Sequence, residues 1–131
     1  MTPPTLQLPP ERSSPSAARR WVRPMVEGRV DDIEGALLCV SEVVTNAVLH
    51  AGTSCEVSVD LGDDRVRIEV RDFAPDRLPV PRELSHTSST GRGLHILAGC
   101  TERWGVERND DAKTVWFELG VEDAEADHSS A

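Results

Sequence analysis

A carboxylate, a carboxamide and an imidazole follow one another at four-residue spacing in this chain, as Glu42, Asn46 and His50. In an α-helix, residues four apart project from the same face with their β-carbons about 6 Å apart. The apolar residues from Leu37 to Val48 recur at helical spacing, which predicts a helix that buries one side. The three polar groups would then lie in a row on another face, one turn apart.

Those residue types suit the handling of a phosphate. The side-chain oxygen of Asn46 can bind a hard cation such as Mg2+, which proteins hold through few ligands together with phosphates and water. Glu42 can orient or deprotonate a hydroxyl that attacks phosphorus. An ordinary amphipathic helix with a polar edge has the same spacing, so both interpretations stay open here. His50 either lines the phosphate side or is a polar residue near a helix end.

Two later segments could complete a nucleotide site. Asp72 ends a predicted strand, where its carboxylate could accept a hydrogen bond from an exocyclic amine or could serve as a turn residue. Gly91 and Gly93 precede a short predicted helix over 94–100. Backbone N–H groups of such a loop can approach phosphate oxygens, although glycines also simply permit sharp turns. The chain would then have three parts of a nucleotide site, namely a cation ligand with a base, an adenine acceptor and a phosphate-binding loop. Their combination indicates nucleotide binding far more specifically than any one of them.

The elements before the polar row are less regular. Residues 1–15 are rich in proline, and we expect them to be disordered. Ser16 can cap a helix over about 17–27. Pro24 lies inside that helix and should kink or divide it, because proline lacks the backbone donor and clashes with the preceding turn.

The polar row and the strands after it are better defined. Its helix is expected to begin at Asp31 or Asp32 and to stop at Gly52, which tolerates left-handed backbone angles. Alternating apolar and polar residues predict a β-hairpin with strands over 55–61 and 65–71.

The rest of the chain follows a long loop. Residues 75–90 show no sustained periodicity, which is typical of a functional lid or a disordered loop. Two strands are predicted over about 101–107 and 114–119, followed by a disordered acidic tail over 120–131. The resulting order, α-α-β-β-loop-α-β-β, predicts the α+β class, a two-layer α/β sandwich. The domain itself would span 16–119.

Composition limits the classes of function. The chain has 131 residues and a net charge of -9, which indicates one domain and argues against nucleic acid or an anionic membrane as its main partner. It has no apolar run of eighteen residues and no signal-like start, so we expect a cytoplasmic protein without a membrane partner. Three widely spaced cysteines suggest buried thiols in a reducing compartment.

Four segments together resemble the GHKL, or Bergerat-fold, ATPases. They look like the family's N box, G1 box, G2 box and final threonine-bearing strand, and are, in order, Glu42-x-x-x-Asn46-Ala47, Asp72-Phe73-Ala74-Pro75, Thr90-Gly91-Arg92-Gly93-Leu94 and Lys113-Thr114-Val115-Trp116-Phe117. From the small size of the chain we expect no attached histidine-phosphorylation domain. In this respect the chain is similar to the stand-alone branch, the anti-sigma-factor serine/threonine kinases.

The resemblance implies a fold, a ligand and a role for each matching residue. It implies a mixed, mainly antiparallel sheet with helices on one face and with ATP and Mg2+ bound beside the lid. Asn46 would be the Mg2+ ligand, Glu42 the general base and Asp72 the acceptor of the adenine amine. The other residues implied to contact nucleotide are His50, Ala74, Gly91, Arg92, Gly93, Leu94 and Thr114.

The resemblance also implies partners. Members of this branch phosphorylate a serine or threonine of an anti-sigma-factor antagonist, sequester a sigma factor and form homodimers. Ala74 and Pro75 stand where the wider superfamily has glycines. That departure keeps open a second hypothesis, a nucleotide-binding regulatory module that holds a protein partner without phosphotransfer. A third hypothesis is a plain ATPase, in which water replaces the acceptor hydroxyl.

Overall fold

The computed structural model describes residues 2–74, 97 and 99–121. Within them, one five-stranded sheet has the strand order β1-β2-β3-β5-β4, and every neighbouring pair is antiparallel. Its strands are β1 (Thr5–Leu8), β2 (Cys55–Leu61), β3 (Arg65–Asp72), β4 (Arg103–Arg108) and β5 (Lys113–Gly120). The predicted α+β class is confirmed, and the sheet is antiparallel throughout rather than mixed.

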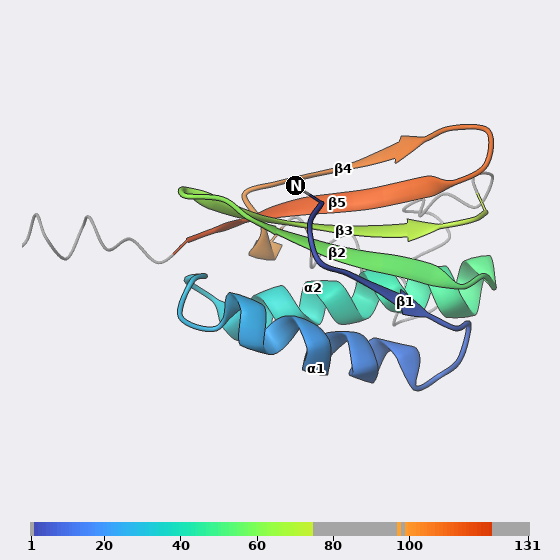
Figure 1. The fold of residues 1–131 in the computed structure, drawn as a ribbon, viewed down its shortest axis with the longest axis horizontal. Helices are drawn as coiled ribbons and strands as arrows, with labels where there is room; N and C mark the ends of the chain where they lie inside the picture. The colour runs from blue at the N-terminus through green and yellow to red at the C-terminus, as the bar shows by residue number, and fades with distance from the viewer. Residues whose placement is uncertain (1, 75–96, 98, 122–131) are drawn as a thin grey trace, which may run out of the picture.

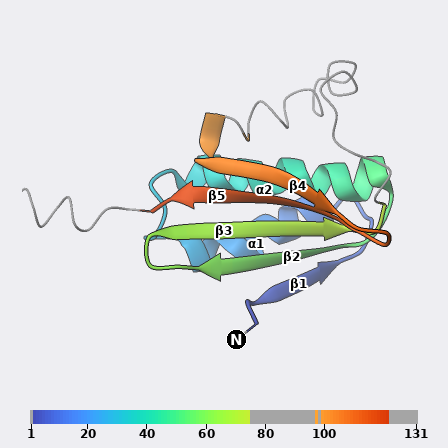
Figure 2. The same ribbon diagram turned by 90° about the horizontal axis from the view of Figure 1, so that it is seen from above.

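Two helices cover one face of this sheet, as Figures 1 and 2 show. They are α1 (Ser14–Val26) and α2 (Ile33–Thr45), and α2 continues without a break into a short π-helix, η1 (Asn46–Ala51). Helices α1 and α2 pack against each other, and α2 and η1 both contact β3. The layer that carries Glu42 and Asn46 is therefore held against the centre of the sheet.

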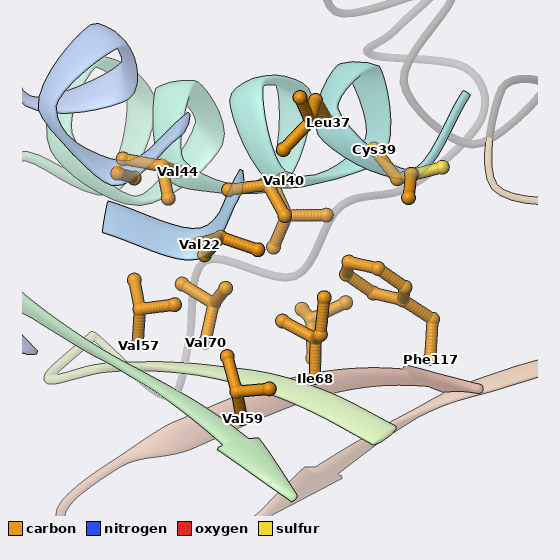
Figure 3. Packing of buried hydrophobic residues seen from close by; sticks show 14 of the residues in the cluster. Val22, Leu37, Cys39, Val40, Val44, Val57, Val59, Ile68, Val70 and Phe117 are labelled. Atoms are coloured by element: carbon orange, nitrogen blue, oxygen red, sulfur yellow. The ribbon is translucent and has the colours of Figure 1, made fainter. Parts of the chain in front are cut away.

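The core lies between the two layers (Figure 3). Val22 of α1 and Val40 of α2 meet strand residues such as Ile68 and Phe117, and all four side chains are fully buried. Burying a side chain of this size contributes roughly 1.5–3 kcal/mol. Alternate residues of β3 supply one apolar row to this core.

The ends of α2 and η1 agree with the prediction. Asp32 is the N-cap, and its Oδ1 accepts a hydrogen bond from the backbone N–H of Gly35 at 2.9 Å. At the other end Gly52 has φ 73°, a left-handed angle that costs glycine little. The hairpin is confirmed as well, with Val59 of β2 opposite Ile68 of β3.

The prediction of a disordered N-terminus is wrong for its central part. Residues Thr5–Leu8 form β1 and pair with β2 at the edge of the sheet, with Leu8 opposite Cys55. Prolines on both sides obscured this strand in the sequence, yet proline is compatible with an edge strand, where one side of the backbone needs no partner. Leu8 is buried in the core, which anchors the segment.

Helix α1 also differs from its prediction. It begins at Ser14, so the N-cap is Ser13 rather than Ser16, and Pro15 occupies the first turn, where its missing N–H costs nothing. Pro24 does not divide the helix, which continues to Val26. A proline so close to the C-terminal end disturbs only the last turn.

The final strands lie close to their predicted positions, and β5 extends to Gly120. Val121 then forms an isolated bridge to Val30, so the segment predicted as a disordered tail begins in ordered structure. The predicted lid, most of the predicted helix over 94–100 and the tail beyond Val121 lie outside the described residues.

The continuous helix Ile33–Ala51 is 19 residues long with a mean hydropathy of 1.3, which is long and apolar enough to cross a membrane. Half of its most apolar window is buried inside the domain. Its contacts with α1 and the sheet account for that composition, because the central helix of a small core needs the same residues.

Candidate nucleotide-binding site

Asn46 lies where the central helix changes from α to π geometry. Its backbone N–H still bonds to the carbonyl of Glu42, four residues back, whereas the N–H of Gly52 bonds to Ala47, five residues back. Short π segments inside helices are frequent at functional sites. The first step of the predicted row therefore keeps its α-helical spacing, and the step from Asn46 to His50 does not.

The three side chains of the row differ in exposure. Glu42 and Asn46 are half-buried, and His50 is exposed. The carboxamide of Asn46 makes no hydrogen bond within the part of the chain that the structure describes. Its oxygen is therefore available to a ligand, as a role in cation binding requires.

Asp72 is buried at the end of β3. Its position continues the apolar row of Val66, Ile68 and Val70, so its side chain lies on the face that α2 and η1 cover. Its Oδ2 is 3.2 Å from Nζ of Lys113, the directly opposite residue of β5, and each of these two side chains is less than 5% exposed. The carboxylate predicted to receive adenine thus belongs to a buried ion pair.

Two further hydrogen bonds fix the backbone beside this pair. The N–H of Ala74 donates to Oδ1 of Asp72 at 3.0 Å, which forms a tight turn at the start of the predicted G1 box. The N–H of Phe73 donates to Oγ1 of Thr53 at 3.2 Å. Since Thr53 lies two residues beyond the end of η1, the end of the central helix is tied to the strand end that carries Asp72.

Thr114 does not join this group. Residues of a strand alternate between faces, and Lys113 points into the buried layer with Asp72. Thr114 is half-buried and belongs to the other face of β5. Of these two neighbouring residues, the structure therefore places Lys113 beside Asp72, and the predicted role of Thr114 stays a prediction.

Sequence reasoning did not single out Lys113, although one signal was present. Lys113 is the only lysine in the chain, beside thirteen arginines, and it stands in a strand whose alternate residues are apolar. Lysine is almost never fully buried without a partner. Gly91, Arg92, Gly93 and Leu94 lie outside the described residues, so their predicted contacts with phosphate stay predictions.

The described residues fit Mg-ATP in the chemistry of their donors. Within the described ranges no group of three or more His, Cys, Asp and Glu side chains could hold a metal by itself. Magnesium typically takes one or two protein oxygens and completes its shell with phosphates and water. The available oxygen of Asn46, with Glu42 one turn away, matches that pattern.

Two of the three cysteines, Cys39 and Cys55, are buried as predicted. Burial raises the pKa of Cys39 to about 12, and the neighbouring thiol of Cys100 adds to the effect. Burial also raises the pKa of Cys55 to about 12, with the carboxylate of Asp72 as the next contributor. Cys100 is only partly buried, and none of the three cysteines forms a disulfide bond.

We expect iodoacetamide at pH 8 to modify Cys100 well before Cys39 and Cys55, because the thiolate is the reactive species. Mass spectrometry of time points from the folded protein measures the three rates. In urea all three residues should react alike. Equal rates in the folded protein would contradict the burial of Cys39 and Cys55.

Comparison with known proteins agrees with this geometry. A family model described as the histidine kinase-like ATPase domain matches residues 9–119. A protein of Streptomyces coelicolor (strain ATCC BAA-471 / A3(2) / M145), described only as uncharacterized, is 32% identical over 81 residues, which cover 58% of this chain and 76% of the relative. The range that the family model matches includes the central helix, Asp72 and Lys113. The chain belongs to the histidine kinase-like ATPase domain family.

Proposed function

We propose that this protein is an ATP-dependent protein serine/threonine kinase of the anti-sigma-factor type. The main observation behind the proposal is that Glu42 lies one helical turn before Asn46, at the point where α2 becomes η1. The carboxamide of Asn46 is available to a ligand. Family membership supplies the nucleotide, since histidine kinase-like ATPase domains imply ATP binding. Glu42 supplies what phosphotransfer needs beyond binding, a carboxylate beside the cation ligand.

In the proposed reaction the hydroxyl oxygen of an acceptor serine or threonine attacks the γ-phosphorus of ATP. The bond from that phosphorus to the bridging oxygen breaks, and ADP leaves with the bonding electrons. Glu42 takes the hydroxyl proton, and Asn46 would hold Mg2+, which neutralises phosphate charge. The products are a phosphorylated protein and ADP, with the proton on Glu42 before its release to solvent.

The proposed acceptor is an anti-sigma-factor antagonist, and the proposed second partner is a sigma factor that the kinase sequesters. Both follow from the similarity of this chain to the stand-alone branch, as does a homodimer. The proposed cytoplasmic location rests on the sequence features described above. The net charge of -9 supports a protein acceptor over a nucleic acid.

One observation favours a second function, a regulatory module that holds a partner without transferring phosphate. Both oxygens of the Asp72 carboxylate already have partners, in Lys113 and the N–H of Ala74. A carboxylate has about four acceptor positions, so adenine can still bind, but it must share the group. Weaker nucleotide binding would suit a module that responds to ATP without turning it over.

The test is transfer of radioactive phosphate from γ-labelled ATP, with Mg2+, to purified anti-sigma-factor antagonist proteins. We expect labelling with the unmodified protein and a loss of about 100-fold or more with Glu42→Gln, while ATP affinity is unchanged. Glu34→Gln, an exposed glutamate of the same helix paired with Arg23, is the matched control and should keep full transfer.

The other outcomes separate the alternatives. Phosphate release without a labelled protein would identify a plain ATPase. ATP binding with neither transfer nor release would favour the regulatory module. Full transfer by Glu42→Gln would exclude Glu42 as the base.

A further inference from the structure

The only lysine of the chain is buried in the candidate site. Lys113 is 3% exposed, and its ammonium lies 3.2 Å from Oδ2 of Asp72. We infer that Lys113 is a specificity-determining residue that donates a hydrogen bond to the adenine ring nitrogen beside the amino group held by Asp72. This inference rests on the proposed ATP site and extends it, since it gives a second side chain a direct contact with the base.

The chemistry of the pair matches adenine. The exocyclic amine of adenine is a donor, and each ring nitrogen next to it, N1 on one side and N7 on the other, is an acceptor. Asp72 offers an acceptor and Lys113 offers a donor on adjacent strands, in direct register. An ammonium has three N–H donors, so it can bond to the carboxylate and to further acceptors at the same time.

Stability alone is a weak reason for this pair. Removing two charges from water costs several kcal/mol each, and a pair of apolar side chains of similar volume is often as stable or more stable. The preceding buried positions of β3 are all apolar, as are Val115 and Phe117 of β5. On the helix-covered face of β3 and β5, the buried residues therefore change from apolar to charged only at the end where the site lies.

Arginine would not serve equally well at this position. The other basic residues of the chain are all arginines, and those on the open face of the sheet, such as Arg67 and Arg103, form ion pairs there with Glu118. An ammonium is a compact donor on a flexible stem, whereas a guanidinium is a broad planar fork. A compact donor can bond to Asp72 and leave room beside it for a flat base.

A single lysine makes the test direct. Protein grown with lysine labelled at the ε-position should give one side-chain NMR signal, from Lys113. We expect ATP and adenosine both to shift this signal at saturation, because the proposed contact is with the base. An unchanged signal while calorimetry shows ATP binding would overturn the inference, and so would a shift with inorganic triphosphate but not with adenosine.

Two analogues identify the bond. In 1-deaza-ATP and 7-deaza-ATP, one ring nitrogen is replaced by C–H, and we expect one of them to bind the unmodified protein about 10- to 100-fold more weakly than ATP. Lys113→Met should bind ATP more weakly and no longer distinguish that analogue from ATP. Arg108→Met is the matched control, because Arg108 is the exposed neighbour of Lys113 on β4 and should keep the discrimination.

The remaining outcomes are also decisive. Equal affinity of the unmodified protein for ATP and both analogues would overturn the inference, as would a discrimination that persists in Lys113→Met. If Lys113→Met does not fold, the NMR signal and the analogue affinities of the unmodified protein still show whether Lys113 contacts the base. Failure of the proposed ATP site is a different result, since then neither ATP nor any analogue would bind at all, and failure of the proposed kinase activity would appear in the phosphate-transfer assay alone.

Discussion

Replacing Asp72 by asparagine is expected to lower the free energy of unfolding by about 3–5 kcal/mol. The substitution keeps the size of the side chain but removes the negative charge that lies 3.2 Å from the buried ammonium of Lys113. Small domains are stable by only about 5–15 kcal/mol, so this loss is a large share of the total. Urea unfolding followed by circular dichroism measures it.

Two controls separate the ion pair from a general effect of charge. Asp60→Asn removes an exposed carboxylate from β2 and should change the stability by less than about 0.5 kcal/mol. The double variant Asp72→Asn with Lys113→Met should recover most of the lost stability, because it leaves no unpaired buried charge. If Asp72→Asn alone were as stable as the unmodified protein, the buried pair would be excluded.

Replacing Asn46 by alanine is expected to weaken Mg2+-dependent ATP binding by more than about tenfold. Even residues that only support a metal ligand typically cost 10–100-fold in affinity when they are changed, and Asn46 is proposed as a ligand itself. The fold should be little affected, because the carboxamide is half-buried and makes no hydrogen bond to the described residues.

Isothermal titration with ATP, with and without Mg2+, measures the effect of Asn46→Ala. Its expected signature is the loss of the magnesium-dependent part of the affinity, and the magnesium-free part should stay. Glu34→Gln at the start of the same helix serves as the control and should bind like the unmodified protein. Magnesium dependence that survives in Asn46→Ala would remove this residue from the cation site.

The elements with strong local signals could be predicted from the sequence. The β2–β3 hairpin follows from strict alternation, and the structure places Val59 of β2 opposite Ile68 of β3. The central helix begins at the cap Asp32 and ends at Gly52 for reasons that are local to those residues. The family resemblance depended on these well-marked elements and is confirmed by the family match.

The elements that the sequence did not predict depend on contacts between residues that are distant in sequence. Strand β1 has no turn or helix signal of its own and is ordered only because the edge of β2 is open to pairing. The widening from α2 into η1 is likewise invisible in the residue pattern, which fits both helix types. It is this widening that separates His50 from the row of Glu42 and Asn46.

The difference between Thr114 and Lys113 has the same physical origin. Neighbouring residues of a strand point to opposite faces, so an error of one position moves a side chain through the sheet. A threonine is an ordinary strand residue and drew attention by resemblance alone. The register of β3 against β5 was needed to show that Lys113 is the residue that faces Asp72.

The central claim is that this domain has a working magnesium-dependent ATP site, and calorimetric titration of the unmodified protein tests it most directly. We predict that ATP binds and that Mg2+ tightens the binding, as the available oxygen of Asn46 requires. No heat of binding at millimolar ATP, with or without Mg2+, would contradict the proposal.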